Sequence, residues 1–243
     1  MLMLYVLSVV FIATLIRSAL GFGEALVAVS LLALRIPVQI AAPLAVLVSI
    51  TVAAVVVARD WREIHVRSAG WLVVSSLFGI PAGVLILMNG HDRGVKAALA
   101  VVIIAFSAYS LIGRTPPELK TDSRPWLLLC GFCAGVLGGA YGMNGPPLVV
   151  YGAMRRWSAR HFRATLQAYF LPASIIGLGG YWLAGLWVPA VTRYYVLSLP
   201  VALPAIFLGG AVNRRVHGQA FFKLVYIGLA GVGAILLMQA LSA

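Results

Sequence analysis

Apolar residues fill most of this chain, in ten segments that polar or glycine-rich stretches separate. A helix needs about 20 apolar residues to cross the hydrocarbon core of a bilayer. Segments 22–34 and 145–154 are too short to cross unless they are tilted or partial. The pattern predicts an all-α polytopic membrane protein. The ten segments are residues 1–16, 22–34, 38–58, 69–88, 94–112, 125–140, 145–154, 162–185, 191–211 and 218–241.

Each short segment follows a glycine-rich break, SALGFGE at residues 18–24 and GGAYGMNGPP at residues 138–147. Lipid cannot hydrogen-bond a broken helix, so such backbone is tolerated only inside protein or along a cavity. Transporters place broken helices near the membrane midplane, with the half-helix ends facing the substrate. The breaks therefore indicate a binding site, and close helix packing through small residues is the alternative. For Gly131, Gly135 and Gly139, four residues apart, we expect packing.

The two halves of the chain align with one another. Ala19, Gly21 and Val29 match Ala140, Gly142 and Val150 at a constant offset, and further matches follow at slightly larger offsets. This order predicts two repeats, residues 1–112 and 125–243, joined by the polar linker 113–124. Each repeat would hold a Gly-broken helix pair followed by three transmembrane helices.

The composition supports a membrane protein with no soluble domain. Hydrophobic residues make up 62% of the chain and charged residues 10%, whereas a soluble domain carries about 25% charged residues. The net charge of +12 lies in short loops, where it typically sets membrane orientation. We therefore expect the lipid bilayer, and no nucleic acid, as the partner of these charges. We expect residues 1–16 to be a retained span.

The distribution of Lys and Arg predicts that the repeats are inverted. If each broken pair were one ordinary helix, the two sides of the membrane would carry similar numbers of basic residues. If each pair turns back, one side collects thirteen basic residues and the other keeps only Arg35, Arg93, Lys96 and Arg193. The positive-inside rule favours this second arrangement. It places the linker in the cytoplasm and both termini in the periplasm of a bacterial inner-membrane protein. The thirteen are Arg59, Arg62, Arg67, Arg114, Lys120, Arg124, Arg155, Arg156, Arg160, Arg163, Arg214, Arg215 and Lys223.

The chemistry of the breaks suits an anion. A helix N-terminus carries partial positive charge and unpaired N–H groups, and glycine lets a ligand approach the backbone closely. Pro146 and Pro147 suit the first turn of a helix. Arg163, Thr165 and Gln167 begin the next segment. Arg163 either binds the anion in a bidentate manner or is a cytoplasmic topology charge.

Glu24 is the only acidic residue inside an apolar segment. An intramembrane carboxylate usually has a partner or a function. It could pair with Arg17 across the bend or carry a coupling proton, and both roles stay open. We favour proton coupling slightly, because seven residues across a broken helix need not bring the two side chains together.

Other features carry little chemistry. No P-loop, G-x-S-x-G or H-E-x-x-H motif is present, so we expect no ATP-driven engine and no enzyme. The pair Cys130 and Cys133 lies in an apolar segment, where we expect two ordinary helix residues and no metal or cofactor. Aromatic residues near segment ends are expected to anchor the protein at the membrane interface. They are Trp61, Trp126, Tyr151, Trp157, Tyr194 and Tyr195.

The runs ALGFGEALVAV (residues 19–29) and LGGAYGMNGPPLV (residues 137–149), followed by FRATL (residues 162–166), resemble the TauE/SafE sulfite exporter family. The resemblance covers nearly the whole chain. It implies a permease for sulfite, organosulfonates or related anions. Glu24 departs from the more glycine-rich first motif of the family. The residues that would line the substrate path are Gly21, Phe22, Gly23, Glu24, Gly142, Met143, Asn144, Gly145, Pro146, Arg163 and Thr165.

The sequence thus predicts a secondary transporter of small anions that alternates access around a midplane site, with export as the direction that the resemblance implies. The alternative is a non-transporting membrane subunit or anchor of a sulfur-metabolism complex. The sequence leaves a homo-oligomer open.

Overall fold

A computed structural model describes residues 1–20, 22–60, 66–113, 118–119, 123–157, 159–215 and 219–242. Within these ranges the chain forms ten helices and no strand. In chain order they are α1 (Leu2–Leu20), α2 (Glu24–Leu32), α3 (Val38–Asp60), α4 (Val66–Asn89), α5 (Asp92–Ile112), α6 (Arg124–Tyr141), α7 (Gly145–Met154), α8 (Ala159–Leu183), α9 (Pro189–Arg215) and α10 (Gln219–Ser242).

The all-helical membrane fold predicted from the sequence is confirmed, and each predicted segment overlaps one helix. Among the described residues, five helices are long and apolar enough to cross a bilayer. Their apolar stretches are Leu2–Ala19, Val38–Ala58, Ala69–Asn89, Arg93–Ile112 and Pro189–Ala211. Prolines lie inside several helices, as at Pro43 of α3 and Pro81 of α4. Membrane helices tolerate such prolines because neighbouring groups satisfy the freed backbone.

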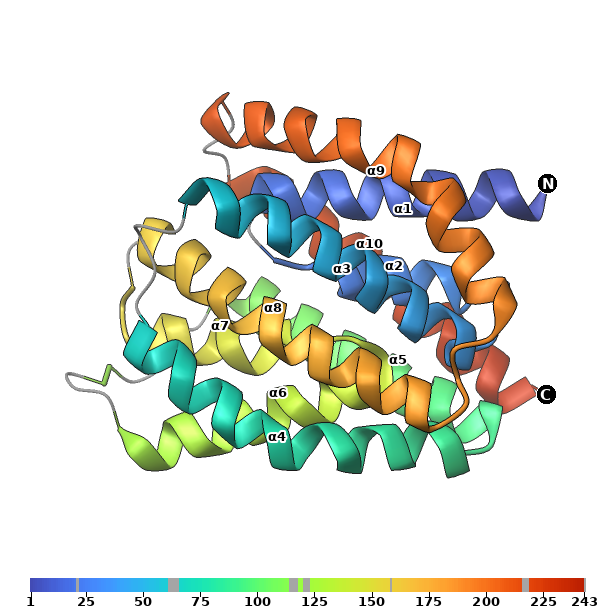
Figure 1. The fold of residues 1–243 in the computed structure, drawn as a ribbon, viewed down its shortest axis with the longest axis horizontal. Coiled ribbons are helices and arrows are strands. Elements are labelled where there is room, and N and C mark those ends of the chain that lie inside the picture. Colours follow the sequence, from blue (N-terminus) through green and yellow to red (C-terminus); the bar gives the residue numbers. More distant parts are fainter. Residues whose placement is uncertain are drawn as a thin grey trace.

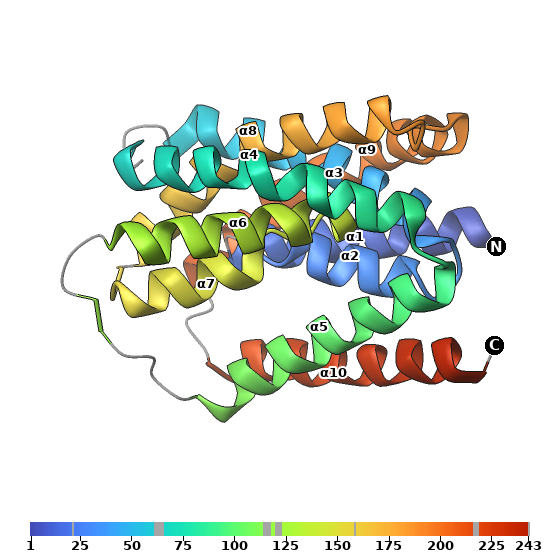
Figure 2. The ribbon, with the colours of Figure 1, turned by 90° about the horizontal axis from the view of Figure 1, so that it is seen from below.

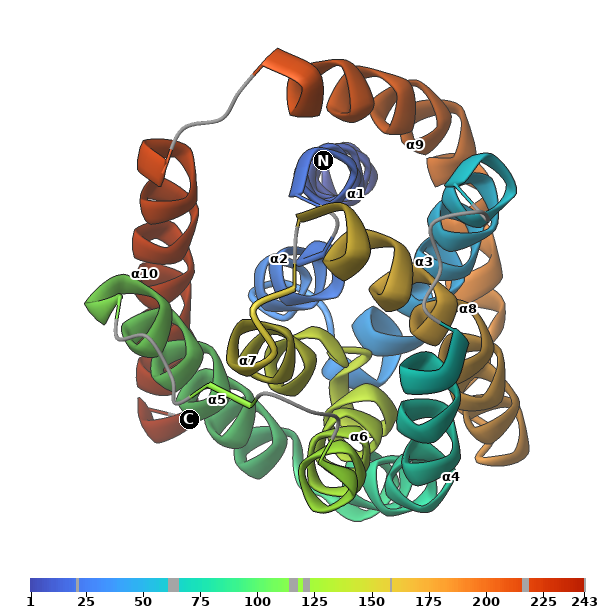
Figure 3. The same ribbon diagram turned by 90° about the vertical axis from the view of Figure 1, so that its left-hand side faces the viewer.

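The short helices α2 and α7 lie at the centre of the molecule, and the longer helices surround them (Figure 3). The main contacts join α4 to α6, α1 to α9, α5 to α10 and α3 to α8. Figure 2 shows the α5–α10 pair along one flank. If each helix of the first half is exchanged for its counterpart in the second half, from α1 with α6 to α5 with α10, the same set of contacts results. The α4–α6 contact becomes the α9–α1 contact, and the α5–α10 and α3–α8 contacts map onto themselves.

The chain ends lie on one side of the fold. Figure 1 places the N- and C-termini at the same end of the molecule. The last turn of α5 and the first turn of α6, which flank the linker, lie at the opposite end (Figure 2).

Small residues bring α4 and α6 into backbone contact, as predicted for Gly131, Gly135 and Gly139. A Cβ atom at Gly135 would lie 2.7 Å from the carbonyl oxygen of Ser76, and one at Gly139 only 2.2 Å from that of Ile80. Such distances leave no room for a side chain, so these glycines allow the two helices to meet closely.

One aromatic residue does not lie where the sequence placed it. Tyr151 was expected at the membrane interface, but it is fully buried and packs edge-to-face on Trp157, with ring centroids 5.5 Å apart. The reason is that α7 is short and central. A residue near the end of such a helix is still inside the protein.

Candidate functional site

A glycine with positive φ lies at each break. Gly23 precedes α2 with φ of 92°, and Gly142 follows α6 with φ of 68°. L-residues with a side chain rarely adopt this region. At the end of α6, the Gly142 N–H donates to the Gly138 carbonyl at 2.8 Å and the Met143 N–H donates to the Leu137 carbonyl at 3.1 Å. These bonds satisfy carbonyls that the helix end would otherwise leave open.

The two breaks meet at one small cavity of about 20 Å³. A cavity of this size has room for a water molecule. The first turns of α2 and α7 both border it, so two helix N-termini point at the same space. The lining residues are Arg17, Phe22, Gly23, Glu24, Ala25, Leu26, Ser49, Phe106, Gly142, Met143, Asn144, Gly145, Pro146 and Phe170.

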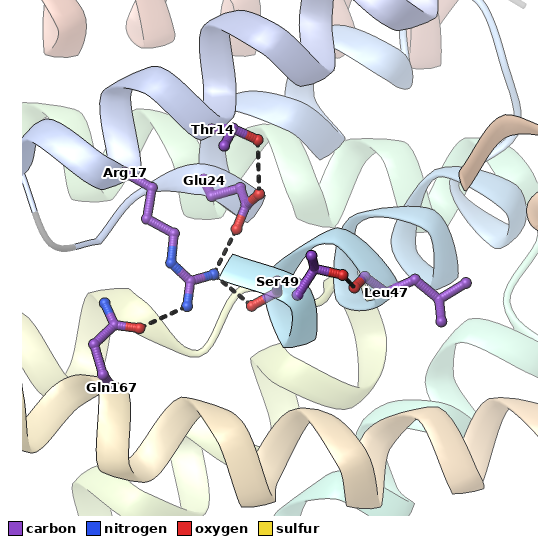
Figure 4. A network of polar contacts seen from close by, with 7 residues as sticks. Thr14, Arg17, Glu24, Leu47, Ser49 and Gln167 are labelled. Carbon is purple, nitrogen blue, oxygen red and sulfur yellow. Dashed lines mark hydrogen bonds and ion pairs between the residues drawn. The ribbon is translucent and has the colours of Figure 1, made fainter. Parts of the chain in front are cut away.

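A buried ion pair stands at one wall of this cavity (Figure 4). Arg17 Nη1 donates to Glu24 Oε2 at 2.5 Å and to Ser49 Oγ at 2.5 Å. Arg17 Nη2 donates to Gln167 Oε1 at 2.9 Å, and Thr14 Oγ1 donates to Glu24 Oε1 at 3.2 Å. The pair thus ties together α1, α2, α3 and α8.

The pair is almost completely withdrawn from solvent. Arg17 is 3% exposed and Glu24 2% exposed. The guanidinium also lies over the Phe170 ring, 5.1 Å from its centroid. The Nε–H group of Arg17 is buried and has no hydrogen-bond partner in the described structure. A buried donor without an acceptor is uncommon and calls for an explanation, such as a bound water or ion.

The second break presents a different surface. Pro146 and Pro147 have no N–H group, so the first turn of α7 offers fewer backbone donors than the sequence argument assumed. Asn144 supplies an amide, whose Nδ2 donates to the Tyr169 hydroxyl at 3.4 Å. The same side chain occupies the space beside Gly138, where an added Cβ would lie 2.7 Å from it. The polar side chain at this break therefore carries no charge.

Most of the residues expected at the site do border the cavity. These are Phe22, Gly23, Glu24, Gly142, Met143, Asn144, Gly145 and Pro146. Gly21 and the side chain of Arg163 lie outside the described residues. Thr165 is buried but is not among the lining residues, and its Oγ1 has no hydrogen-bond partner in the described structure.

Sequence reasoning left six of the lining residues out of the path, and the last three of them come from α3, α5 and α8. The six are Arg17, Ala25, Leu26, Ser49, Phe106 and Phe170. It noted Gln167 without giving it a role. The available signal was weak. Ser49 is a single hydroxyl in a long apolar segment, and phenylalanine is common in membrane helices. Only the packing of α3, α5 and α8 around the breaks distinguishes these positions.

Comparisons with known proteins identify the family of this chain. The model of the family described as sulfite exporter TauE/SafE matches residues 6–236. A protein of Cupriavidus necator named "Probable sulfite/organosulfonate exporter TauE" is 23% identical over 190 residues, which cover 76% of this chain and 71% of that protein. No solved structure matches. The family model covers both breaks and nearly all the helices around them, and this chain belongs to the sulfite exporter TauE/SafE family.

Proposed function

We propose that this protein is a secondary transporter of small sulfur-containing anions, with sulfite and organosulfonates as the leading candidates and export as the direction. The observation that carries the proposal is the shared cavity, where two broken helices present their N-termini beside a buried arginine. Helix N-termini and guanidinium groups both favour oxyanions. The name of the Cupriavidus necator relative supports the same substrate class.

The mechanism that we propose is alternating access between two inverted repeats, residues 1–112 and 125–243. The reciprocal pairing of α4 with α6 and of α1 with α9 supports this division. The position of both termini at one end, opposite the ends of α5 and α6, supports the inversion (Figures 1 and 2). The basic linker side would face the cytoplasm of a bacterial inner membrane.

The path would pass between the two breaks. Its lining would be the predicted residues Phe22, Gly23, Glu24, Gly142, Met143, Asn144, Gly145 and Pro146, joined by Arg17, Ser49 and Phe170. Gly21, Arg163 and Thr165 belong to the same proposed path. Because the cavity holds little more than a water molecule, we interpret the structure as an occluded form, and substrate release needs the halves to move apart.

A ligand screen on the purified protein tests the proposal. A ligand that binds only the folded state raises the melting temperature. We expect sulfite or a sulfonate such as methanesulfonate to raise it, and short carboxylates and sulfate to serve as comparison anions. If neither sulfite nor methanesulfonate shifts the melting temperature, the cavity is not a binding site for this class.

A further inference from the structure

We propose that Arg17 is the residue that binds the substrate anion. Without substrate, the Glu24 carboxylate pairs with Arg17. When Glu24 takes up a proton, it leaves Arg17 and the substrate anion binds in its place. The inference rests on the proposed transport function. It adds to that function a binding residue, a coupling ion and a preference for monovalent anions.

Arg17 is the sole cationic residue among the described side chains that line the cavity. A guanidinium group offers five N–H donors in a planar fork that matches an oxyanion. Glu24, Ser49 and Gln167 accept from three of these donors through the two Nη atoms. The buried Nε–H group has no acceptor in the described structure. A structural ion pair would gain from satisfying that donor, whereas a site awaiting an oxyanion leaves it open.

Charge balance links the proton to the anion. In the structure the carboxylate of Glu24 neutralises Arg17, and the cavity carries no net charge. If a monoanion entered beside an ionised Glu24, two negative charges would share one buried guanidinium, which is costly in a poorly solvated site. If a proton binds Glu24 Oε2 as that oxygen leaves Arg17 Nη1, the carboxyl becomes neutral. The anion then takes the vacated position, and the cavity is again neutral.

No other titratable group competes for this role among the described side chains near Glu24. Helices α1, α3, α5 and α10 pack against α2. Helix α1 contributes Arg17 beside Glu24, and its Tyr5 hydroxyl donates to the Leu31 carbonyl at the other end of α2. Helix α3 contributes the uncharged Ser49. The cavity residue of α5 is Phe106, and the described side chains of α10 include no titratable group. Across the cavity, α8 contributes Gln167 and Phe170, which are also uncharged.

The pair belongs to one half of the molecule only. The offset that matches Gly21 with Gly142 matches Arg17 with Gly138 and Glu24 with Gly145. In the second half, the Asn144 side chain occupies the space beside Gly138, so a neutral contact replaces the ion pair. Because one ion pair lines the cavity among the described residues, one substrate anion can take the place of one carboxylate on Arg17. The expected stoichiometry is one proton and one monoanion moving in the same direction in each cycle, and a dianion would leave one negative charge uncompensated.

Calorimetry in detergent tests the proposal, with methanesulfonate as the probe because it stays a monoanion at every pH used. Sulfite at about pH 6 is the second probe. Titrations in two buffers with different ionisation enthalpies count the protons taken up on binding. For the wild type we expect uptake of about one proton for each anion bound, and weaker binding at about pH 8 than at about pH 6.

The variant Glu24→Gln mimics the protonated carboxyl. It should bind the same anion without proton uptake and with little dependence on pH, and the anion should raise its melting temperature more than that of the wild type. The matched control is Glu118→Gln, an exposed acid in the linker, which should keep the proton uptake. If Glu24→Gln does not fold, the wild-type proton count still decides the question.

The double variant Arg17→Gln/Glu24→Gln removes both charges at once. It should fold but bind the anion at least about tenfold more weakly, whereas Arg193→Gln at an exposed position of α9 should bind normally. Anion binding without proton uptake in the wild type, or binding that survives in the double variant, would overturn the proposal and leave the transport function standing. If the wild type binds neither sulfite nor methanesulfonate, the proposed function itself fails.

Discussion

Arg17 and Glu24 form a buried ion pair beside the first helix break. The sequence identifies Glu24, since a lone carboxylate in an apolar segment is conspicuous. It also names Arg17 as a candidate partner. Their contact depends on the backbone at Gly23, whose φ of 92° folds α2 back beside α1. The structure shows the pairing with Arg17 that the sequence analysis left open, and the proton role of Glu24 stays a proposal.

Removing one member of this pair should cost far more stability than removing both. Glu24→Ala leaves a buried guanidinium without its counter-charge, and we expect the free energy of unfolding to fall by about 3–5 kcal/mol. The double variant Arg17→Met/Glu24→Leu replaces the charges with apolar groups and should recover most of that loss. Denaturant titration in mixed micelles measures both. If the double variant is as unstable as Glu24→Ala, the carboxylate does not act by balancing Arg17.

The sequence was most informative about the number and position of the helices. All ten predicted segments correspond to helices, because the glycine and polar interruptions are clear in a chain this apolar. The ends differ where charged residues extend a helix beyond its apolar segment. Helix α9 continues to Arg215, although the predicted segment stops at residue 211. The packing partners of each helix could not be predicted, because a helix that is apolar on every side shows no preferred face.

The helix breaks should depend on Gly142 more than on Gly145. Gly142 has φ of 68°, and an added Cβ would lie 3.0 Å from Val46 Cγ2. Alanine there should cost about 1–2 kcal/mol for the left-handed backbone alone, and transport should fall sharply. Gly145→Ala should cost little stability, because an added Cβ there would meet only Phe22 at 4.0 Å. A wild-type transport rate for Gly142→Ala in proteoliposomes would show that the backbone of the break is not critical.

The contact between α4 and α6 makes a second prediction at this scale. A Cβ at Gly83 would lie 2.1 Å from the carbonyl oxygen of Val136, so Gly83→Ala must push the two helices apart. Overpacking of this kind typically costs about 1–3 kcal/mol, and the melting temperature should drop. Gly177→Ala is the control, since an added Cβ there meets nothing within 4 Å. A normal melting temperature for Gly83→Ala would mean that the interface is looser than the structure indicates.

At the scale of the whole molecule, the charge distribution predicts how the protein sits in the membrane. The count of Lys and Arg favours inverted repeats with the linker inside and both termini outside. The position of the termini at one end of the fold supports the same arrangement (Figure 1). The cavity between the breaks could be anticipated from the repeat. Its small volume could not, because Phe22, Phe106 and Phe170 reach the cavity from three separate parts of the chain.

Cysteine labelling measures this topology. In a background with Cys130 and Cys133 replaced, a single cysteine in the linker 113–124 and one after α10 should react with a membrane-impermeant reagent from opposite sides. The linker cysteine should be protected in intact cells and exposed in inverted vesicles. Labelling of both positions from the same side would contradict the inverted arrangement.

The most direct test of the central claim is counterflow of radiolabelled sulfite in proteoliposomes. Vesicles loaded with unlabelled sulfite and diluted into trace label should accumulate that label transiently when they contain the wild-type protein. The Arg17→Gln/Glu24→Gln variant should reduce the accumulation to the level of empty vesicles, and Arg193→Gln should not change it. If folded wild-type protein accumulates no more label than empty vesicles, this chain does not transport sulfite through the cavity between α2 and α7.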